Sequence, residues 1–222
     1  PWGELQTDSI ILTVPTSQLV GLTNANELMD FWSDVQDANA ALSGFGPVRE
    51  RAERIVVDRQ ISAGFMHSGY PIMAHVPSGE EFMSLSGLQS GGNWGAFHEL
   101  GHNYQWRDWI LPGTTETTCN LFSVYVSEEV VGIDRGEAHS AISDESRVIR
   151  ISDYLATGPD FGSWSVWTAL ETYLQLQEKF GWAPFTQVFT EQRALSDAES
   201  PGADQARIDF WVLGMSEATN RD

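Results

Sequence analysis

Residues 92–104 read G-N-W-G-A-F-H-E-L-G-H-N-Y and contain the side chains of this sequence best suited to chemistry. His98, Glu99 and His102 form the pattern H-E-x-x-H. On an α-helix, positions four apart lie on one face, so both imidazoles can reach one metal ion. Glu99 lies on the adjacent flank, where its carboxylate can polarise a metal-bound water. The pattern predicts a zinc site with Glu99 as catalytic base; the alternative is a helix with two buried, hydrogen-bonded histidines.

The residues around the motif favour a helix with two different faces. Asn93 is a good N-cap residue, because its side chain can accept a hydrogen bond from the first helical turn. Phe97, Leu100 and Tyr104 form an apolar stripe opposite the histidines, and Gly101 allows a neighbouring element to approach closely. We therefore expect a core side and a histidine side.

A third metal ligand must come from outside the motif, because a catalytic zinc usually has three protein ligands and one open position. Asp108 lies six residues after His102, as in metzincins, but that arrangement needs a glycine where this sequence has Gln105. Glu116 lies fourteen residues after His102, beyond a Pro-Gly turn and at the start of a second predicted helix. Glu116 is the better candidate and would complete a His₂Glu set. Its alternative role is a first-turn glutamate favoured by the helix dipole.

Two neighbours of Glu116 bear on the same site. Asn120 follows one helical turn later, where its amide oxygen can accept the free N–H of a ligand histidine and orient that ring. Cys119 is the only cysteine, which excludes an internal disulfide and a cysteine-based zinc site. The predicted cofactor is one Zn²⁺ per chain, held by nitrogen and oxygen atoms.

Composition and charge limit the classes of partner. The 222 residues, 41% of them hydrophobic, are enough for one domain with a sizeable core. Thirty-one acidic residues against twelve basic ones give a net charge of −19, which repels nucleic acid and anionic membrane surfaces. No apolar run approaches the roughly 20 residues that span a bilayer, and no signal peptide is predicted after Pro1. We expect no nucleic acid partner, no membrane insertion and a monomer.

Strands are predicted before the motif and helices after it, which indicates an α+β fold. The predicted strands are 9–14, 55–57 and 71–76, and the predicted helices besides the motif helix are 24–42, 116–126, 142–155, 165–180, 184–191 and 204–213. Gly44 and Gly46-Pro47 should end the first helix, and 78–92 should form a loop with a short apolar segment. We expect a single domain, 1–222, with a strand-containing subdomain (about 1–105) that includes the active helix. A helical subdomain (about 106–222) should face it across a cleft.

Two stretches, W-G-A-F-H-E-L-G-H-N-Y-Q and L-P-G-T-T-E-T-T-C-N-L-F, resemble the enhancin-like metallopeptidases, which are gluzincins. A softer similarity, as in V-D-R-Q-I-S-A-G-F-M-H-S-G-Y-P-I-M-A-H, extends over nearly the whole chain. The family includes viral enhancins and bacterial mucin-degrading O-glycopeptidases. The resemblance implies a gluzincin-type fold with His98, His102 and Glu116 as zinc ligands and Glu99 as general base. It also implies a secreted or cell-surface endopeptidase that cleaves glycoproteins, especially mucin-type O-glycosylated ones.

Substrate contacts are less defined by the sequence. Cleavage needs a donor for the oxyanion of the tetrahedral intermediate. The candidates, each with a structural alternative, are Tyr154, Tyr70, His67 and His139. Gly92, Asn93 and Trp94 are candidates for an edge that pairs with an extended peptide, and Trp94 can either stack on a sugar or pack in the core.

Two other functions stay open at this point. One is a zinc peptidase of unglycosylated proteins, and the other is a catalytically silent module that binds glycans or proteins. The family resembled here includes members thought to have lost the motif. This chain retains all four residues of the predicted site, which disfavours the silent module.

Overall fold

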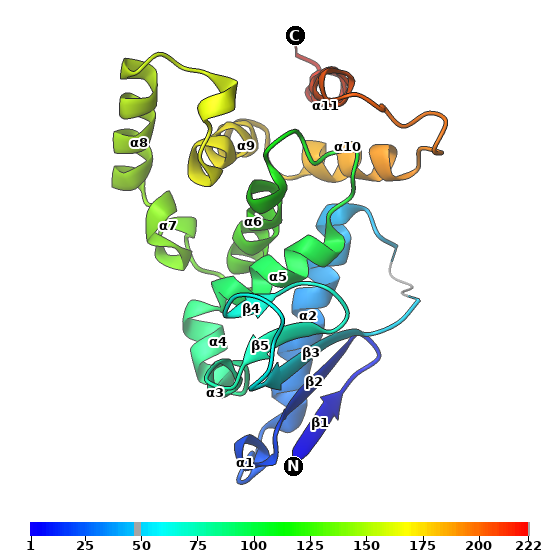
Figure 1. The fold of residues 1–222 in the computed structure, drawn as a ribbon, viewed down its shortest axis with the longest axis vertical. Helices are drawn as coiled ribbons and strands as arrows, with labels where there is room; N and C mark the ends of the chain where they lie inside the picture. Colours follow the sequence, from blue (N-terminus) through cyan, green and yellow to red (C-terminus); the bar gives the residue numbers. More distant parts are fainter. Residues whose placement is uncertain (47–49, 222) are drawn as a thin grey trace.

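The computed structural model describes residues 1–46 and 50–221, and its N-terminal part contains a mixed five-stranded sheet (Figure 1). The strands are β1 (Trp2–Gln6), β2 (Ile10–Pro15), β3 (Glu53–Asp58), β4 (Met66–His67) and β5 (Ile72–His75). They lie in the order β1-β2-β3-β5-β4. The three central strands run parallel, whereas β1 and β4 pair antiparallel at the two edges.

Helices form most of the remaining structure. They are α1 (Thr16–Leu19), α2 (Ala25–Ser43), α3 (Ser78–Phe82), α4 (Leu85–Gly91), α5 (Trp94–Tyr104), α6 (Thr115–Val126), α7 (Arg135–Ala138), α8 (Asp144–Ala156), α9 (Val166–Phe180), α10 (Ala183–Arg193) and α11 (Asp204–Thr219). A π-helical turn, η1 (Ser127–Val131), continues α6, and two 3-10 turns are η2 (Ser140–Ile142) and η3 (Phe161–Ser163).

The mixed sheet and the many helices confirm the α+β prediction. Within the described ranges, no helix has both the length and the apolarity needed to cross a membrane.

A row of apolar side chains crosses the sheet and begins the first core. The strand register places Leu12 opposite Ile55 and Ile55 opposite Ile72, and all three are fully buried. Branched side chains of this kind pack well on a pleated surface. Buried residues of α2 and α5 belong to the same cluster, so both helices pack against the sheet.

The motif helix α5 joins this core to a second, helical one. Phe97 and Leu100 belong to the first cluster, whereas Tyr104 belongs to the second, which contains residues of α9, α10 and α11. All three are buried, as the predicted apolar stripe requires. Figure 1 shows α5 and α6 between the sheet and the C-terminal helices. The helix that carries the motif is therefore held on its apolar side by both cores.

Residues 78–92 are mainly helical, and the loop predicted there is wrong. They form α3 and α4, each anchored by a buried side chain, Phe82 and Leu88. The Ser84 hydroxyl accepts a hydrogen bond from the Gly87 N–H and so caps α4. Short helices rich in glycine and serine have little intrinsic helix propensity, so burial of these anchors decides their conformation.

The sequence analysis also missed β1. Its exposure alternates, with Trp2, Glu4 and Gln6 exposed, and it contains no β-branched residue to signal a strand. Pairing with β2 stabilises it, and the Trp2 indole N–H donates to the Val57 carbonyl at 2.7 Å. These are long-range contacts that local sequence does not show.

Helix ends were predicted unevenly. Gly44 caps α2 in the left-handed region, with φ of 69°, as predicted; residue 47 lies outside the described ranges. Helix α11 continues past 213 to Thr219, because Gly214 faces Val188 of α10 without interrupting the helix. Gly214 is therefore a packing position within α11, although the predicted helix ended one residue before it.

Gly101 is the point of closest approach between α5 and α6, as predicted. A Cβ there would lie 2.5 Å from the Cys119 carbonyl oxygen and 3.0 Å from the Phe122 Cβ. Gly101→Ala must push the two helices apart, so we expect the free energy of unfolding to fall by about 1–3 kcal/mol. Urea denaturation measures this change. In Gly91→Ala, the control, the added Cβ meets nothing within 4 Å; equal losses in both variants would contradict the close-approach explanation.

Candidate metal centre

Helix α5 begins at a well-formed cap and presents both histidines on one face. The Asn93 side chain accepts a hydrogen bond from the Ala96 N–H at 2.9 Å, as its N-cap prediction requires. One turn apart, the rings of His98 and His102 meet edge to face with centroids 4.7 Å apart. Their Nε2 atoms are 3.1 Å apart. Two nitrogen donors therefore converge on one point.

Helix α6 brings Glu116 to the same point. Its Oε2 lies 3.2 Å from His98 Nε2 and 3.3 Å from His102 Nε2. The Glu116 side chain is 59% exposed, against 20% and 13% for the two histidines. The carboxylate side of the group therefore faces solvent, and the histidine side faces the protein.

These three donor atoms fit a zinc ion. Metal–ligand distances of about 2.0–2.1 Å in a tetrahedral site place ligand atoms roughly 3.3 Å apart. The triangle formed by the two Nε2 atoms and Oε2 has edges of 3.1, 3.2 and 3.3 Å. Three ligands of this kind would leave the fourth tetrahedral position for water or substrate, as catalytic zinc sites do.

Asp108 lies apart from this group. Its carboxylate is buried, accepts a hydrogen bond from the Ser200 hydroxyl and lies 3.6 Å from Arg107 Nε. Among the described residues, the side chains that together could hold a metal ion are His98, His102, Glu116 and Cys119, and Asp108 is not one of them. These four residues are called the metal-binding group below. The structure thus favours the downstream glutamate over the metzincin-like alternative.

A side-chain amide oxygen meets the second nitrogen of each histidine. Asn120 Oδ1 lies 2.7 Å from His98 Nδ1, the contact anticipated from its position after Glu116. Gln105 Oε1 lies 2.9 Å from His102 Nδ1, a contact the sequence analysis missed. From the sequence, position 105 was considered only as the place where metzincins need a glycine. The fold shows that Gln105 contacts the ligand histidine His102.

Cys119 was also missed. Its sulfur lies 3.4 Å from His98 Nδ1 and 3.7 Å from Nε2, so it rests against the ring. Burial, followed by the charges of Glu116 and Glu99, raises the pKa of the Cys119 thiol. The buried sulfur packs against the ring of His98 and lies within 4.8 Å of the donor atoms of His98, His102 and Glu116. Glu99 directly follows His98 on α5 and is half-buried.

Three of the four candidate oxyanion donors are engaged elsewhere. His67 lies in β4 with Nε2 2.9 Å from the Ser62 hydroxyl and Nδ1 2.9 Å from the Ser68 carbonyl oxygen. The Arg51 guanidinium covers the ring of Tyr70 at 3.5 Å. None of these contacts involves a residue of the metal-binding group.

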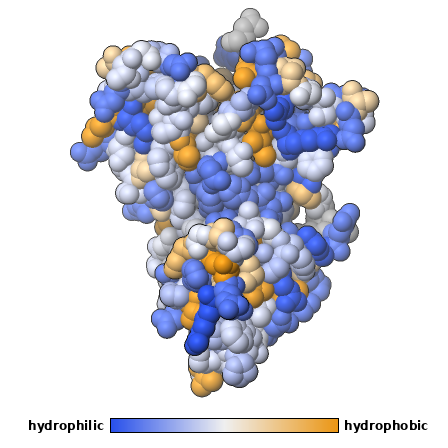
Figure 2. Space-filling model, in the orientation of Figure 1, coloured by the Kyte–Doolittle hydropathy of each residue, from blue (hydrophilic) through white to orange (hydrophobic). Residues whose placement is uncertain are grey.

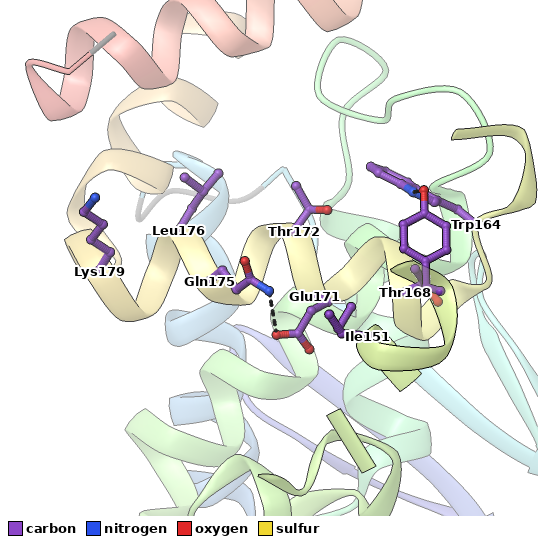
Figure 3. A pocket seen from close by; sticks show the side chains of 9 residues that line it. Ile151, Trp164, Thr168, Glu171, Thr172, Gln175, Leu176 and Lys179 are labelled. Atoms are coloured by element: carbon purple, nitrogen blue, oxygen red, sulfur yellow. Dashed lines mark hydrogen bonds between the residues drawn. The ribbon is translucent and has the colours of Figure 1, made fainter. Parts of the chain in front are cut away.

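Tyr154 lines a separate pocket of about 450 Å³ between α8 and α9. Its hydroxyl accepts a hydrogen bond from the Trp164 indole N–H at 2.8 Å. Figure 3 shows Trp164 and Thr168 at one end of this pocket and Lys179 at the other, with Glu171 and Gln175 between them. No residue of the metal-binding group lines it, so the structure does not bring Tyr154 to the predicted site.

His139 has a different setting. Its ring stacks on Trp167 with centroids 4.5 Å apart and meets Trp94 at 4.8 Å. Trp94 is one helical turn before His98, on the same face of α5. Trp94 therefore packs against aromatic neighbours, which is the core-packing alternative for this residue, and it carries His139 to the edge of the histidine face.

No strand forms at Gly92, Asn93 and Trp94, so the peptide-binding edge expected there stays a prediction. Gly92 caps α4, with its N–H donating to the Leu88 carbonyl, and Trp94 begins α5. No strand passes through these residues. The edge strand of the sheet that packs against α5 is β4 instead.

A family model described as peptidase M60, enhancin and enhancin-like, matches residues 1–222. Among curated proteins, the chain is 51% identical over 223 residues to TRPM8 channel-associated factor 2 of Bos taurus. That match covers 100% of this chain and 24% of the relative, so the chain spans about a quarter of its length.

Solved structures share the fold at low sequence identity. A functionally unknown conserved protein from Bacillus anthracis str. Ames matches with a TM-score of 0.83 at 20% identity, over 98% of this chain and 46% of that one. IMPa from Pseudomonas aeruginosa, in complex with an O-glycopeptide, matches with a TM-score of 0.61 at 18% identity, over 100% and 32%. These likenesses establish a shared α+β fold.

Proposed function

Because the chain belongs to the peptidase M60 family of enhancin and enhancin-like proteins, we propose that it is a zinc-dependent endopeptidase. The triangle of donor atoms from His98, His102 and Glu116 carries this proposal, because its edges of 3.1 to 3.3 Å suit one tetrahedral metal ion. The family model matches the whole chain, and the triangle identifies the atoms that would hold the metal. Both observations support metal-dependent peptide hydrolysis.

The residues around this triangle have separate roles in the proposed peptide hydrolysis. Zinc bound there would supply a Lewis acid that lowers the pKa of water and polarises the scissile carbonyl. Glu99, next to the ligand His98, accepts the proton of the attacking water and passes it to the leaving amine. The exposed side at Glu116 admits the substrate, while the buried Cys119 closes the opposite side of His98.

Strand β4 offers an edge to an extended peptide. It is the last strand of the sheet, pairs with β5 on one side and packs against α5. Asn103, directly after His102, fixes the adjoining turn: its side chain accepts from the Gly69 N–H and donates to the Gly69 carbonyl, each at 3.0 Å. A substrate strand added to β4 would therefore lie beside α5, close to the residue that follows His102.

Glycoproteins with mucin-type O-glycans are the proposed substrates. The motif stretches resemble those of O-glycopeptidases, and IMPa, which shares the fold, was solved in complex with an O-glycopeptide. A zinc peptidase of unglycosylated proteins uses the same metal and base, so substrate digestion has to distinguish them.

Metal analysis combined with digestion of casein and mucin tests the proposal. We expect about one zinc per chain, as for a single three-ligand site, and cleavage of mucin that stops when zinc is chelated. Cleavage of casein but not of mucin would assign the enzyme to unglycosylated substrates. A chain that binds no zinc and cleaves neither protein would overturn the proposal.

A binding role is the second candidate. The relative from Bos taurus is named for its association with the TRPM8 channel, which suggests a domain that binds a membrane protein instead of cleaving it. Retention of His98, Glu99, His102 and Glu116 favours the peptidase. Mucin or a channel protein retained intact on the zinc-loaded chain would favour the binding module.

His139 is the best placed of the four candidate donors for the oxyanion. Its neighbour Trp167 lies at the start of α9, where the Val166 carbonyl accepts a hydrogen bond from the Thr117 hydroxyl at 3.2 Å. The ring of His139 thus lies between Trp94 of α5 and Trp167 of α9, and α9 is hydrogen-bonded to α6 at Thr117, the residue after Glu116. The Ala141 N–H donates to His139 Nδ1 at 3.1 Å, which leaves the proton on Nε2. Burial lowers the pKa of His139, which favours the neutral ring.

His139→Phe keeps a ring between the two tryptophans and removes the donor. We expect kcat on a mucin substrate to fall by about 100-fold, as when one oxyanion donor is lost, with zinc content unchanged. Tyr154→Phe, which removes a hydroxyl in the separate pocket, is the control and should keep the activity of the unaltered chain. A loss of kcat in Tyr154→Phe but not in His139→Phe would reverse this assignment.

A further inference from the structure

Gln105 ends α5 and connects it to α6. Its backbone is extended, with φ of −60° and ψ of 150°, and its N–H donates to the Gly101 carbonyl. Its side chain turns back between the two helices. Oε1 lies 2.9 Å from His102 Nδ1, and Nε2 donates to the Thr115 carbonyl at 2.7 Å and to the Thr118 hydroxyl.

This network permits one orientation of the amide. The Thr115 carbonyl can only accept a hydrogen bond, and the Thr118 hydroxyl donates its proton to the Thr114 carbonyl. The NH₂ group of Gln105 must therefore face α6, and its oxygen must face His102. An amide oxygen can only accept, so the neutral ring of His102 carries its proton on Nδ1 and leaves the Nε2 lone pair for the metal position.

Asn120 makes the same arrangement for His98. Its Nδ2 donates to the Glu116 carbonyl at 2.8 Å, and its Oδ1 faces His98 Nδ1 at 2.7 Å. Each histidine of α5 is thus tied through one carboxamide to one carbonyl of the first turn of α6. That turn also carries the third ligand, Glu116. The two carboxamides therefore link all three donor groups to one turn of backbone.

We propose that Gln105 is a positioning residue that sets the tautomer and ring orientation of His102 before any metal binds. This inference rests on the proposed function, since it assigns Gln105 a role at the same zinc site. Together, Gln105 and Asn120 direct the Nε2 atoms of His102 and His98 toward the same point as Glu116 Oε2 in the metal-free protein. Partners of this kind typically contribute 10–100-fold to metal affinity or activity.

Substitutions at Gln105 separate its two hydrogen-bonding ends. Gln105→Leu keeps similar volume and removes both, whereas Gln105→Glu keeps an acceptor for His102 and removes the donor to Thr115. Long-range ¹H–¹⁵N NMR of histidine-labelled, metal-free protein at about pH 8, where free imidazole is neutral, reports the tautomer directly. Zinc competition against a chromophoric chelator reports affinity. Gln187→Leu, at an exposed position of α10, is the matched control.

We expect His102 to be protonated on Nδ1 in the unaltered chain, in Gln105→Glu and in Gln187→Leu, and to lose that preference in Gln105→Leu. Zinc affinity in Gln105→Leu should fall by about tenfold or more. The signals of His67, whose ring contacts Ser62 and Ser68 and not the metal-binding group, should not change, which shows that the variant is folded; Gln105→Met serves if Gln105→Leu does not fold. A His102 that stays protonated on Nδ1 in the apolar variant, with zinc affinity within about twofold, would overturn the inference.

The two hypotheses fail differently. An unaltered chain that binds no zinc and cleaves no mucin contradicts the proposed function, while the metal-free tautomer still decides the role of Gln105. An unaltered chain that binds zinc and cleaves mucin, combined with an unchanged tautomer in Gln105→Leu, contradicts the role of Gln105 alone.

Discussion

Glu99→Gln is expected to lower peptide cleavage by about 10²–10⁴-fold, the range for a lost general base. Glutamine has nearly the shape of glutamate but cannot accept the proton of the attacking water. The metal ligands proposed here do not include Glu99, so zinc content should stay at one ion per chain. The measurement is the rate of mucin cleavage together with zinc content of the same preparation.

Glu145→Gln is the matched control for this substitution. It removes one negative charge from an exposed position in the first turn of α8, remote in the chain from the motif. Its cleavage rate should equal that of the unaltered chain. Loss of zinc together with activity in Glu99→Gln would assign Glu99 a structural role at the site, and undiminished cleavage would remove it from the mechanism.

Glu116→Ala should weaken zinc affinity by more than about 100-fold. Even residues that only orient ligands contribute 10–100-fold, and Glu116 supplies a donor atom itself. The two histidines alone leave the third corner of the triangle empty, and water must replace the carboxylate. Isothermal titration of the metal-free protein with zinc, or competition with a chelator, gives the ratio of affinities.

Asp108→Asn distinguishes the two candidates for the third ligand. The new amide oxygen can still accept the Ser200 hydroxyl proton, so the local packing is kept while the charge is lost. We expect zinc affinity within about twofold of the unaltered chain and some loss of stability, because Arg107 loses a partner. A large loss of affinity in Asp108→Asn with none in Glu116→Ala would mean that the site is not of the gluzincin type.

The fold was predictable where local pattern and tertiary environment agree. The buried strands β2, β3 and β5 and the helices α2, α6 and α9 have the periodicity of their burial, so their positions follow from the sequence to within a few residues. The failures occur where stability comes from distant contacts. β1 forms because β2 supplies hydrogen bonds, and α3 and α4 form because Phe82 and Leu88 enter the core.

The sequence by itself determined that His98 and His102 share one face of a helix, because a spacing of four residues and the Asn93 cap are local properties. It also identified Gly101 as a contact position and predicted Glu116 as a ligand. Only the tertiary structure decided what surrounds them. The packing of α5 on α6 brings Glu116 within 3.3 Å of both histidines and turns Gln105 and Cys119 toward the rings.

The same packing separates the candidate donors, leaving Tyr154 between α8 and α9 and carrying His139 to the start of the motif helix. It also makes β4 the edge strand beside α5, whereas Gly92 caps α4. These outcomes depend on how α5, α6 and the sheet meet. That arrangement is set by the two hydrophobic cores and not by any one segment of sequence.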